Sequence, residues 1–496
     1  MRIIYENIKK RASEADTSWG SAYGLFGKVL EKKGLKRGVE IGVAFGGHAE
    51  SILRISTIDK LYGIDPYLNM KDYNDPMNLS QEEFDQLYRF TLDRLAPFGD
   101  RYQHIRKKSK DSVINVPELD FVYINSDHSY KGVWEDLCEW YPKIRIGGVI
   151  GGHDYNHPNF PGVKQAIDEF FGRFSWEVHT EGEGVWWVEK QSLNISFIMP
   201  AYNCEKTVQE SVESILEGNF IEGDELVIVN DCSTDNTKSV LEQLQLKYPL
   251  IKIFQHQKNK GGAAARNTAI ENTKNQIIFC LDSDNVLVNE SIQKLKLFLE
   301  KSGSDVASFQ GLYYFQNDKN DISHKWIFKE GITTLSDYLS GPVVPGASGN
   351  YMFTKDSWNR AGGYPEFSGA LDAWGFGFRQ LATGSKMVVM PESYYYHRYG
   401  HESYWIRESK KGKTSLIAIQ ILIPFLDLLN DEDVDYIMSR QGRYLWFENL
   451  KKHPIRVKLN SSGSSGCIKR DHYKQRFSDH LYQMKSAIYL LLKKVK

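Results

Sequence analysis

The residues of this 496-residue chain that could carry chemistry gather where short apolar runs end. Asp282, Ser283 and Asp284 follow the apolar run 277–281, and the polar cluster 230–235 follows the run 226–229. Carboxylates beyond the end of a strand can bind a cation, but they can also do no more than form the turn. The two aspartates alone leave both interpretations open.

The elements that must position these clusters alternate between strands and helices. Helical spacing predicts helices over 207–216 and 237–246, and small residues after Gly261 let a further helix begin close to a ligand. Such alternation implies a parallel sheet, with ligands bound beyond the carboxyl ends of its strands. The predicted strands are 195–199 (ending at Pro200), 226–229, 251–254 and 277–281.

Four motifs in this order resemble the nucleotide-binding half of family 2 glycosyltransferases with the GT-A fold: 200–203, 230–235, 261–267 and 282–284. The resemblance continues to about residue 405 and implies a nucleotide-sugar donor. Asp231 would accept the uracil N–H of a UDP-sugar. By the same resemblance, the donor contacts would come from Pro200, Ala201, Tyr202, Asp231, Gly262, Arg266, Asp282 and Ser283.

The resemblance also implies a divalent metal at the donor diphosphate, because that leaving group develops negative charge. Asp284 would be its main protein ligand, and His397 falls where some GT-A enzymes supply a histidine, with His401 as the other candidate. A histidine beside a carboxylate suits Mn²⁺ at least as well as Mg²⁺. Because His397 stands among tyrosines, the alternative is a packed loop residue.

A catalytic base is expected at Asp372. The family usually has Glu-Asp here, and this chain keeps only the second acid, in Leu371-Asp372. An inverting transfer needs a carboxylate to take the proton of the acceptor hydroxyl. The alternative for Asp372 is an N-cap of the following helix. Upstream of it, Gly346–Phe353 resembles the acceptor-side strand of the family.

The first third of the chain has its own glycine-rich turn. Residues 38–47 predict a strand, a turn and a helix start, and 61–65 predict a strand that ends in Asp65, a carboxylate that can accept both hydroxyl protons of a ribose. Together with 119–130 and 146–155, these segments resemble class I S-adenosylmethionine-dependent methyltransferases of the sugar O-methyltransferase group, over residues 36–190. The resemblance implies that Glu40, Gly42, Gly46 and Asp65 hold the cofactor, although the turn has fewer glycines than the common pattern.

In that group two acidic positions bind a divalent metal, and Asp127 and Asp154 match them. Two carboxylates and water suit Mg²⁺, which would hold neighbouring sugar hydroxyls and lower the pKa of the one to be methylated. His128, or else His153, would then take the proton. The alternative is that Asp127 caps the next helix and both histidines are ordinary loop residues.

Composition limits the remaining function classes. The formal net charge of −1 gives no electrostatic case for nucleic acid. The five cysteines are scattered, and Cys280 lies in a predicted buried strand, so a reduced compartment is expected. No signal peptide is expected in 1–13, and the apolar stretch 416–429 is short for a membrane span. These features predict a soluble cytoplasmic protein. The basic, amphipathic 480–495 would pack on the catalytic domain or, alternatively, touch a membrane surface.

The predicted fold class is α/β, with two Rossmann-like domains and a C-terminal helical region. The expected domains are a methyltransferase over 1–190, a glycosyltransferase over 194–405 and a mostly helical 406–496, with helices and loops in 1–36. The expected function is bifunctional: sugar transfer to a glycan acceptor and O-methylation of the glycan. The alternatives are a glycosyltransferase with a non-catalytic methyltransferase-like binding domain, and a glycan-binding scaffold without activity.

Overall fold

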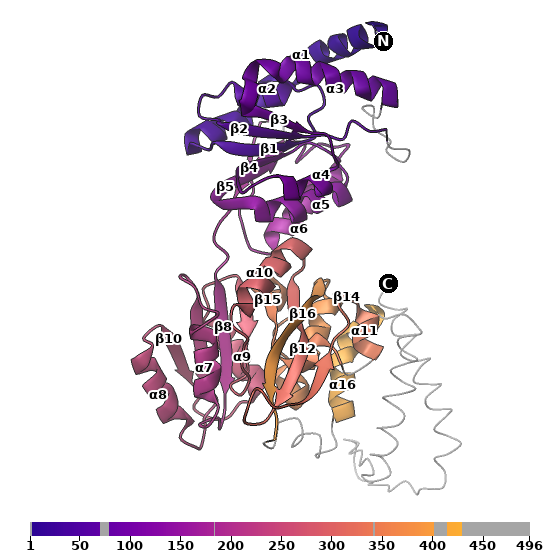
Figure 1. The fold of residues 1–496 in the computed structure, drawn as a ribbon. Coiled ribbons are helices and arrows are strands. Elements are labelled where there is room, and N and C mark those ends of the chain that lie inside the picture. Colours follow the sequence, from indigo (N-terminus) through magenta and orange to yellow (C-terminus); the bar gives the residue numbers. More distant parts are fainter. Residues whose placement is uncertain (1, 70–78, 183, 341–342, 401–413, 429–496) are drawn as a thin grey trace, which may run out of the picture.

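The computed structural model describes residues 2–69, 79–182, 184–340, 343–400 and 414–428. Figure 1 shows two α/β lobes, one above the other, each built around a twisted sheet. The predicted α/β class with two sheets is therefore confirmed. His401 and the predicted helix near the end of the chain lie outside the described residues.

The first lobe begins with one long helix, α1 (Arg2–Lys33), where the sequence predicted helices and loops. Ile8, Ala12, Phe26 and Leu30 are buried on one side of it, so packing against the lobe keeps the helix continuous. The other helices are α2 (Gly47–Leu53), α3 (Gln81–Leu95), α4 (Ser109–Ser112), α5 (Tyr130–Trp140) and α6 (Pro161–Gly172). The strands are β1 (Arg37–Ile41), β2 (Lys60–Ile64), β3 (Tyr102–Ile105), β4 (Leu119–Ile124), β5 (Ile144–Gly152), β6 (His179–Glu181) and β7 (Val185–Glu189).

The sheet of the first lobe has the order β3-β2-β1-β4-β5-β7-β6. Strands β1 to β5 are parallel, and β7 runs antiparallel to β5. The strand order reverses between β1 and β4, and folds of this kind bind ligands beyond the carboxyl ends of the strands at such a point. Glu40 lies near the carboxyl end of β1, and the other predicted cofactor and metal residues follow β1, β2, β4 and β5, so all of them lie along one edge of the sheet.

In the described residues of the second lobe, nine strands form one mixed sheet. The strands are β8 (Ile195–Ala201), β9 (Glu225–Asn230), β10 (Ile251–Gln255), β11 (Ile277–Cys280), β12 (Val306–Phe315), β13 (Ile322–Ile327), β14 (Gly331–Thr333), β15 (Met352–Thr354) and β16 (Met387–Arg398). The helices are α7 (Val208–Leu216), α8 (Thr237–Lys247), α9 (Gly262–Glu271), α10 (Ser291–Ser302), α11 (Leu335–Ser340), α12 (Pro345–Ser348), α13 (Lys355–Arg360), α14 (Asp372–Ala382) and α16 (Thr414–Leu422).

The order of this sheet is β10-β9-β8-β11-β15-β12-β16-β14, with β13 paired to β12. Two expectations were wrong. Strand β8 does not stop at Pro200, because Pro200 and Ala201 still pair with β9. Proline is tolerated here because pairing with β11 ends at Ile198, so β11 needs no backbone N–H from Pro200. Residues 346–353 are not one strand, because Gly346–Ser348 belong to α12 and only β15 is extended.

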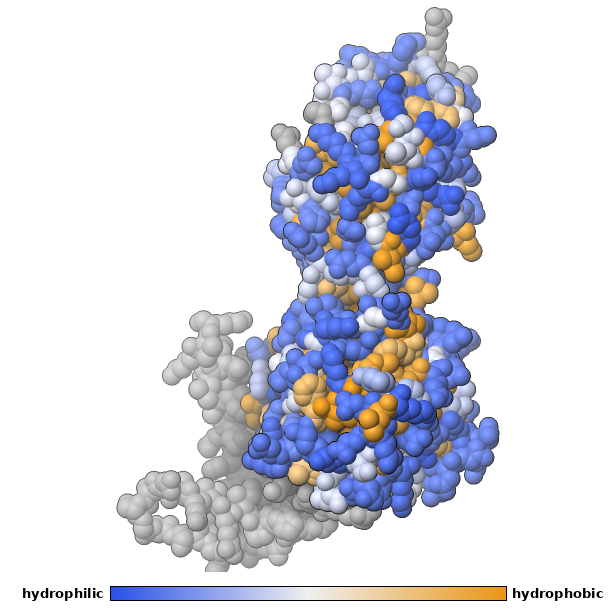
Figure 2. Space-filling model, turned by 90° about the vertical axis from the view of Figure 1, so that its left-hand side faces the viewer, coloured by the Kyte–Doolittle hydropathy of each residue, from blue (hydrophilic) through white to orange (hydrophobic). Residues whose placement is uncertain are grey.

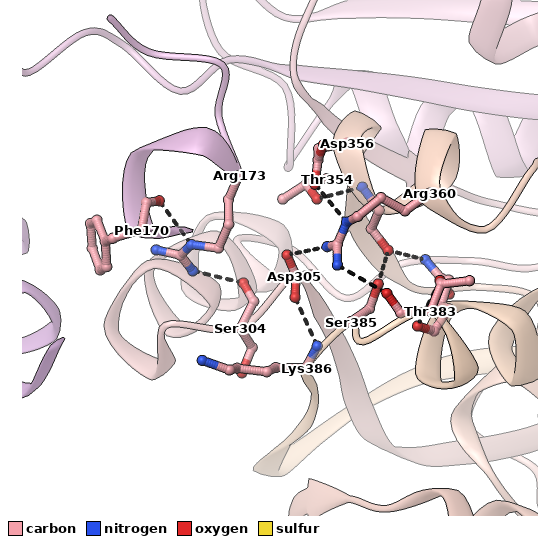
Figure 3. Close-up of polar contacts among 12 residues, drawn as sticks. Phe170, Arg173, Ser304, Asp305, Thr354, Asp356, Arg360, Thr383, Ser385 and Lys386 are labelled. Atoms are coloured by element: carbon pink, nitrogen blue, oxygen red, sulfur yellow. Dashed lines mark hydrogen bonds and ion pairs between the residues drawn. The ribbon is translucent and has the colours of Figure 1, made fainter. Parts of the chain in front are cut away.

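The two lobes share packing at their junction. Phe174, just after α6, is 1% exposed and belongs to the apolar core of the second lobe, while Trp176 packs against both cores. Arg173 donates from Nη1 to the carbonyl oxygen of Ser304 at 2.9 Å, and beside it Asp305 accepts from Arg360 and from the backbone N–H of Lys386 (Figure 3). The lobes are therefore docked through buried side chains.

The face shown in Figure 2 is mostly hydrophilic, with a narrower waist between the lobes and a hydrophobic area on the second lobe. Among the described residues, no helix combines the length and apolar character that a membrane crossing needs.

Candidate active sites

Arg266 joins two of the predicted carboxylates of the second lobe. Its Nη2 lies 2.6 Å from Oδ1 of Asp282, and its Nη1 lies 2.6 Å from Oδ2 of Asp372. Asp282 follows β11, Arg266 lies in α9, and Asp372 begins α14. Three residues that the sequence placed in separate motifs thus form one ion-paired group.

Burial governs the charges of this group. Burial raises the pKa of Asp372, while Arg266 and the N–H of Ala373 oppose the rise. The two carboxylates hold the pKa of Arg266 well above its usual value, against desolvation. A Cβ on Gly262 would lie 2.9 Å from both Arg266 Nη1 and Asp372 Oδ2, so glycine leaves room for the pair.

Asp372 is the first residue of α14, and its Oδ1 accepts the N–H of Ala373 at 2.7 Å. The carboxylate therefore contacts the start of the helix and the guanidinium at once. The N-cap interpretation is wrong, because Leu371 holds that position and Asp372 lies inside the first turn. The interpretation of Asp372 as a catalytic base stays a prediction.

Asn350 is a site residue that the sequence interpretation missed. Its Oδ1 accepts the N–H of Asp282 at 2.6 Å, and its Nδ2 donates to the hydroxyl of Tyr395 at 3.2 Å. Asn350 is fully buried, between α12 and β15. The signal available in the sequence was a lone polar residue before the apolar 351–353.

The carboxylate of Asp231, the predicted uracil contact, is already hydrogen-bonded within the protein. Its carboxylate accepts the N–H groups of Lys260 and Gly261 at 2.8 and 2.7 Å, and Oδ1 lies 2.7 Å from Nδ1 of His256. Asp231 is 2% exposed, so it shapes the loop before α9, and its contact with uracil stays a prediction. Pro200 and Ala201 end β8 beside this loop, and Tyr202 is partly exposed beyond them.

The predicted metal residues of this lobe come from neighbouring segments. Val286 forms an antiparallel bridge with Tyr396, which brings β16 and His397 to the chain segment of Asp284. Arg398 donates from Nε to the carbonyl oxygen of Asp284 at 3.1 Å, and Thr207 donates to that of Ser283 at 2.9 Å. Within the described ranges, three metal-type side chains do not gather here, so a metal would depend on diphosphate oxygens as well.

The glycine turn of the first lobe is tied to Asp65. Oδ2 of Asp65 accepts the N–H groups of Val43 and Ala44 at 3.1 Å each, and Oδ1 accepts that of Tyr67 at 2.9 Å. Burial raises the pKa of Asp65, and these three N–H groups oppose the rise. The carboxylate expected to meet a ribose therefore also fixes the turn.

Glu40, Gly42 and Gly46 lie at the same edge of the sheet. Gly42 and Gly46 have φ of 85° and 75°, and a Cβ on Gly42 would lie 1.9 Å from the carbonyl oxygen of Asn125. Glu40 is fully buried; its Oε1 lies 3.0 Å from His48 Nδ1, and its Oε2 has no hydrogen-bond partner among the described residues. An orphaned buried carboxylate oxygen fits a cofactor that brings a cationic donor.

The residues after β4 and β5 form a different cluster from the predicted pair of aspartates. Nε2 of His153 and of His128 lie 3.4 and 3.7 Å from Oδ2 of Asp154. Burial lowers the pKa of His153 to about 3, so its imidazole is neutral at physiological pH. Asp127 instead accepts the N–H of Ser129 at 2.8 Å, at the start of α5.

Residues 196–362 match the family model "Glycosyl transferase family 2", and residues 39–155 match the model "Methyltransferase domain". The two matches fall in different lobes of the structure.

Curated relatives match the second lobe. The poly(ribitol-phosphate) beta-N-acetylglucosaminyltransferase TarS of Staphylococcus aureus is 33% identical over 278 residues, which are 54% of this chain and 47% of TarS. The UDP-Glc:alpha-D-GlcNAc-diphosphoundecaprenol beta-1,3-glucosyltransferase WfgD of Escherichia coli is 31% identical over 140 residues, which are 28% of this chain and 53% of WfgD. The chain spans about half the length of these relatives. A crystal structure of S. aureus TarS 1-349 with UDP-GlcNAc is 21% identical, with a TM-score of 0.43, covering 54% of this chain and 76% of that one.

Proposed function

We propose that this protein is a bifunctional enzyme of glycan biosynthesis. Its second lobe transfers a sugar from a UDP-sugar to a glycan acceptor with inversion, and its first lobe O-methylates the glycan with S-adenosylmethionine. The observation that carries the glycosyl transfer is the group in which Arg266 contacts both Asp282 and Asp372. It sets a candidate base beside the predicted diphosphate site.

In this mechanism Asp372 takes the proton of the acceptor hydroxyl as the oxygen attacks the anomeric carbon. Arg266 keeps the carboxylates of Asp282 and Asp372 in one arrangement and offsets their charge. Asp284 and His397 are the residues that would hold a divalent cation. When bound, Mn²⁺ or Mg²⁺ would balance the charge on the leaving diphosphate.

The donor and acceptor classes are part of the proposal. WfgD carries UDP-Glc in its name, and TarS is named for a poly(ribitol-phosphate) acceptor. Together with Asp231, which follows β9 and accepts from Gly261 in the loop before α9, these names support a UDP-sugar as donor and a cell-envelope or exported glycan as acceptor.

The methyl transfer is proposed for the crevice at β1 and β4. Glu40, Gly42, Gly46 and Asp65 would hold S-adenosylmethionine, which supplies an electrophilic methyl group when bound. His128 is the candidate base for the glycan hydroxyl. A second candidate function is a binding domain without catalysis, favoured by one observation: the Asp65 carboxylate already accepts three backbone N–H groups.

The glycosyl half is tested by UDP release from a panel of UDP-sugars, with and without acceptor and Mn²⁺. Asp284→Ala should abolish metal-dependent donor binding and leave the fold intact. Asp318→Asn, on an exposed turn in which Asp318 accepts from Asn320, is the matched control. Unchanged turnover in Asp284→Ala would remove the metal role, and absence of UDP release with every donor would overturn the proposed transfer. Calorimetry with S-adenosylmethionine separates a methyltransferase from a domain that has lost its cofactor.

A further inference from the structure

The cluster after β4 and β5 has the composition and spacing of a transition-metal site. One ligand-type atom from each of His128, His153 and Asp154 lies within 4.8 Å of the other two. Two donors held at about 2.0–2.1 Å by one tetrahedral ion lie about 3.4 Å apart. The His153–Asp154 and His128–Asp154 separations of 3.4 and 3.7 Å need little adjustment to reach that value.

The surrounding residues fix the three side chains. The His128 ring packs on Phe160 at 4.8 Å and meets the His153 ring edge-to-face at 5.1 Å. The His153 ring is nearly parallel to that of Tyr123. Rings held in this way cannot turn away from a shared ion without repacking.

The backbone at Asp154 is specialised as well. Asp154 has φ of 63°, a conformation that residues other than glycine seldom adopt and that functional sites often retain. Tyr155 N–H donates to the carbonyl oxygen of Gly184 at 3.0 Å, and a Cβ on Gly184 would come within 3.5 Å of Asp154. Gly184, just before β7, therefore packs against Asp154 and helps to hold its backbone conformation.

The carboxylate pair expected for Mg²⁺ is not what the side chains form. Asp127 accepts from Ser129, and its carboxyl carbon would lie 2.4 Å from a Cβ on Gly132, so it is turned toward the start of α5. Two imidazoles with one carboxylate suit Zn²⁺ and other first-row divalent ions, whereas Mg²⁺ prefers oxygen ligands alone.

We propose that His128, His153 and Asp154 bind a first-row transition-metal ion of the Zn²⁺ class, with Asp127 outside the ligand set. Three protein ligands leave a coordination position for water or a sugar hydroxyl. The His128 and His153 side chains are 20% and 24% exposed, so an ion can enter from solvent. With the ion bound, His128 is a ligand and not the base, and the ion would instead promote loss of the proton by lowering the pKa of the sugar hydroxyl that it holds. This role of the ion rests on the proposed methyl transfer, but its binding does not, so the two can fail separately.

The test is Zn²⁺ binding by the full chain without a histidine tag, stripped with EDTA and titrated by calorimetry in excess Mg²⁺. Co²⁺ serves as a spectroscopic probe, because its visible absorption reports ligand number and type. We expect wild type to bind one more equivalent of Zn²⁺ than His153→Gln. Asp154→Asn should weaken Zn²⁺ binding about 100-fold or more. Substitutions of residues that only contact the ligands typically weaken metal binding by about 10- to 100-fold.

Two variants discriminate the ligand set. Asp127→Asn and His157→Gln should bind Zn²⁺ as wild type does; His157 is the matched control, a histidine that stacks on the same Phe160 ring. Loss of binding in Asp127→Asn together with normal binding in His153→Gln would overturn the proposal in favour of the carboxylate site. Equal Zn²⁺ binding in all variants would overturn it outright. Thermal unfolding without metal checks each fold, and His128→Gln supplies a second ligand variant if Asp154→Asn does not fold.

Discussion

Arg266 is the central side chain of the proposed glycosyl site, because its two Nη atoms contact carboxylates from different motifs. The guanidinium is buried, as is Asp372, whereas Asp282 is partly exposed. The two charge-assisted contacts fix the separation of the two carboxylates. Asp282 also has its N–H bound by Asn350, so the group is anchored from the backbone side.

Asp372→Asn should lower the turnover of glycosyl transfer by about 10² to 10⁴ while leaving donor affinity nearly unchanged. Asparagine keeps the shape of the side chain and one oxygen, which can still accept from Ala373, but its amide NH2 replaces the oxygen that accepts from Arg266, and it cannot take a proton. Steady-state turnover and UDP-sugar titration measure the two effects. Weak donor binding with normal saturated turnover would show that Asp372 is not the base.

The pH dependence of glycosyl transfer should reflect the burial of Asp372. Because the folded pKa of Asp372 is raised, glycosyl transfer should fall as pH drops through a value above the usual aspartate range near 3.9. Removing the positive charge in Arg266→Gln should raise that pKa further and move the acid limb to higher pH. Arg266→Lys keeps the charge and should move it less. An acid limb that does not respond to either variant would assign it to another group.

Asp65 fixes the glycine turn and is also the residue proposed to contact the cofactor. Asp65→Ala should weaken S-adenosylmethionine binding and also lower the free energy of unfolding of the cofactor-free chain by about 1–3 kcal/mol, because three N–H groups lose their acceptor. Calorimetry and thermal unfolding measure the two effects. Asp59→Ala, at an exposed position, is the control, and an unchanged stability in Asp65→Ala would contradict the structural role.

At the scale of elements, strands β12 and β16 connect the junction of the lobes to the glycosyl site. Asp305 and Lys386 precede these strands at the junction, while Tyr395 and His397 lie near the other end of β16. On the first lobe, α5 begins just after His128 and contacts α10. Lys386 Nζ lies 3.6 Å from the ring centre of Trp134 in α5. Each site therefore shares an element with the junction.

Phe174→Ala should uncouple the unfolding of the two lobes. Phe174 is 1% exposed within the core of the second lobe, and its truncation should cost about 3–5 kcal/mol. Scanning calorimetry should resolve two transitions where wild type shows one. Phe171→Ala is the matched control: Phe171 is buried in the core of the first lobe and should destabilise that lobe without parting it from the second. One shared transition in Phe174→Ala would contradict the coupling.

For the whole molecule, the junction contacts hold the two lobes, and with them the two proposed sites, against each other. The link between β7 and β8 is only residues 190–194, and Lys190 still pairs with Gly148 on β5. Tethering raises the effective concentration of one product at the other site, into the mM range for short connections. This helps only if one product is the other substrate.

Sugar transfer should therefore precede methylation on the same glycan, since a methyl group on the acceptor hydroxyl would block extension there. With acceptor, donor and labelled S-adenosylmethionine, label should enter the glycan only when donor sugar is present. Omitting one component at a time supplies the controls. Equal labelling of the acceptor without donor would reverse the order, and label on an unrelated molecule would break the link between the two activities.

The α/β class and the strands that precede the predicted site residues could be predicted from the sequence, whereas β3, β6, β12, β13, β14 and β16 were not predicted. Apolar runs with period 2 or 3.6 are local properties, and β9, β10 and α8 agree with the predicted ranges to within one residue. Polar clusters at strand ends also predicted that Asp282 and Asp65 lie beyond the carboxyl ends of β11 and β2, where ligands are expected. Long-range packing was not determined: α1 is one helix because it packs on the lobe, and β8 passes Pro200 because β11 has already ended.

Which side chains meet could not be predicted from the sequence, because it depends on how distant elements pack. Arg266 and Asp372 are 106 residues apart, and no local pattern joins them or adds Asn350 to the site. His128, His153 and Asp154 meet because β4 and β5 are neighbours, while Asp127 turns to its own helix. Sequence patterns specify which face of an element is buried, but the direction of each polar atom depends on rotamers and partners that are set when separate elements pack together.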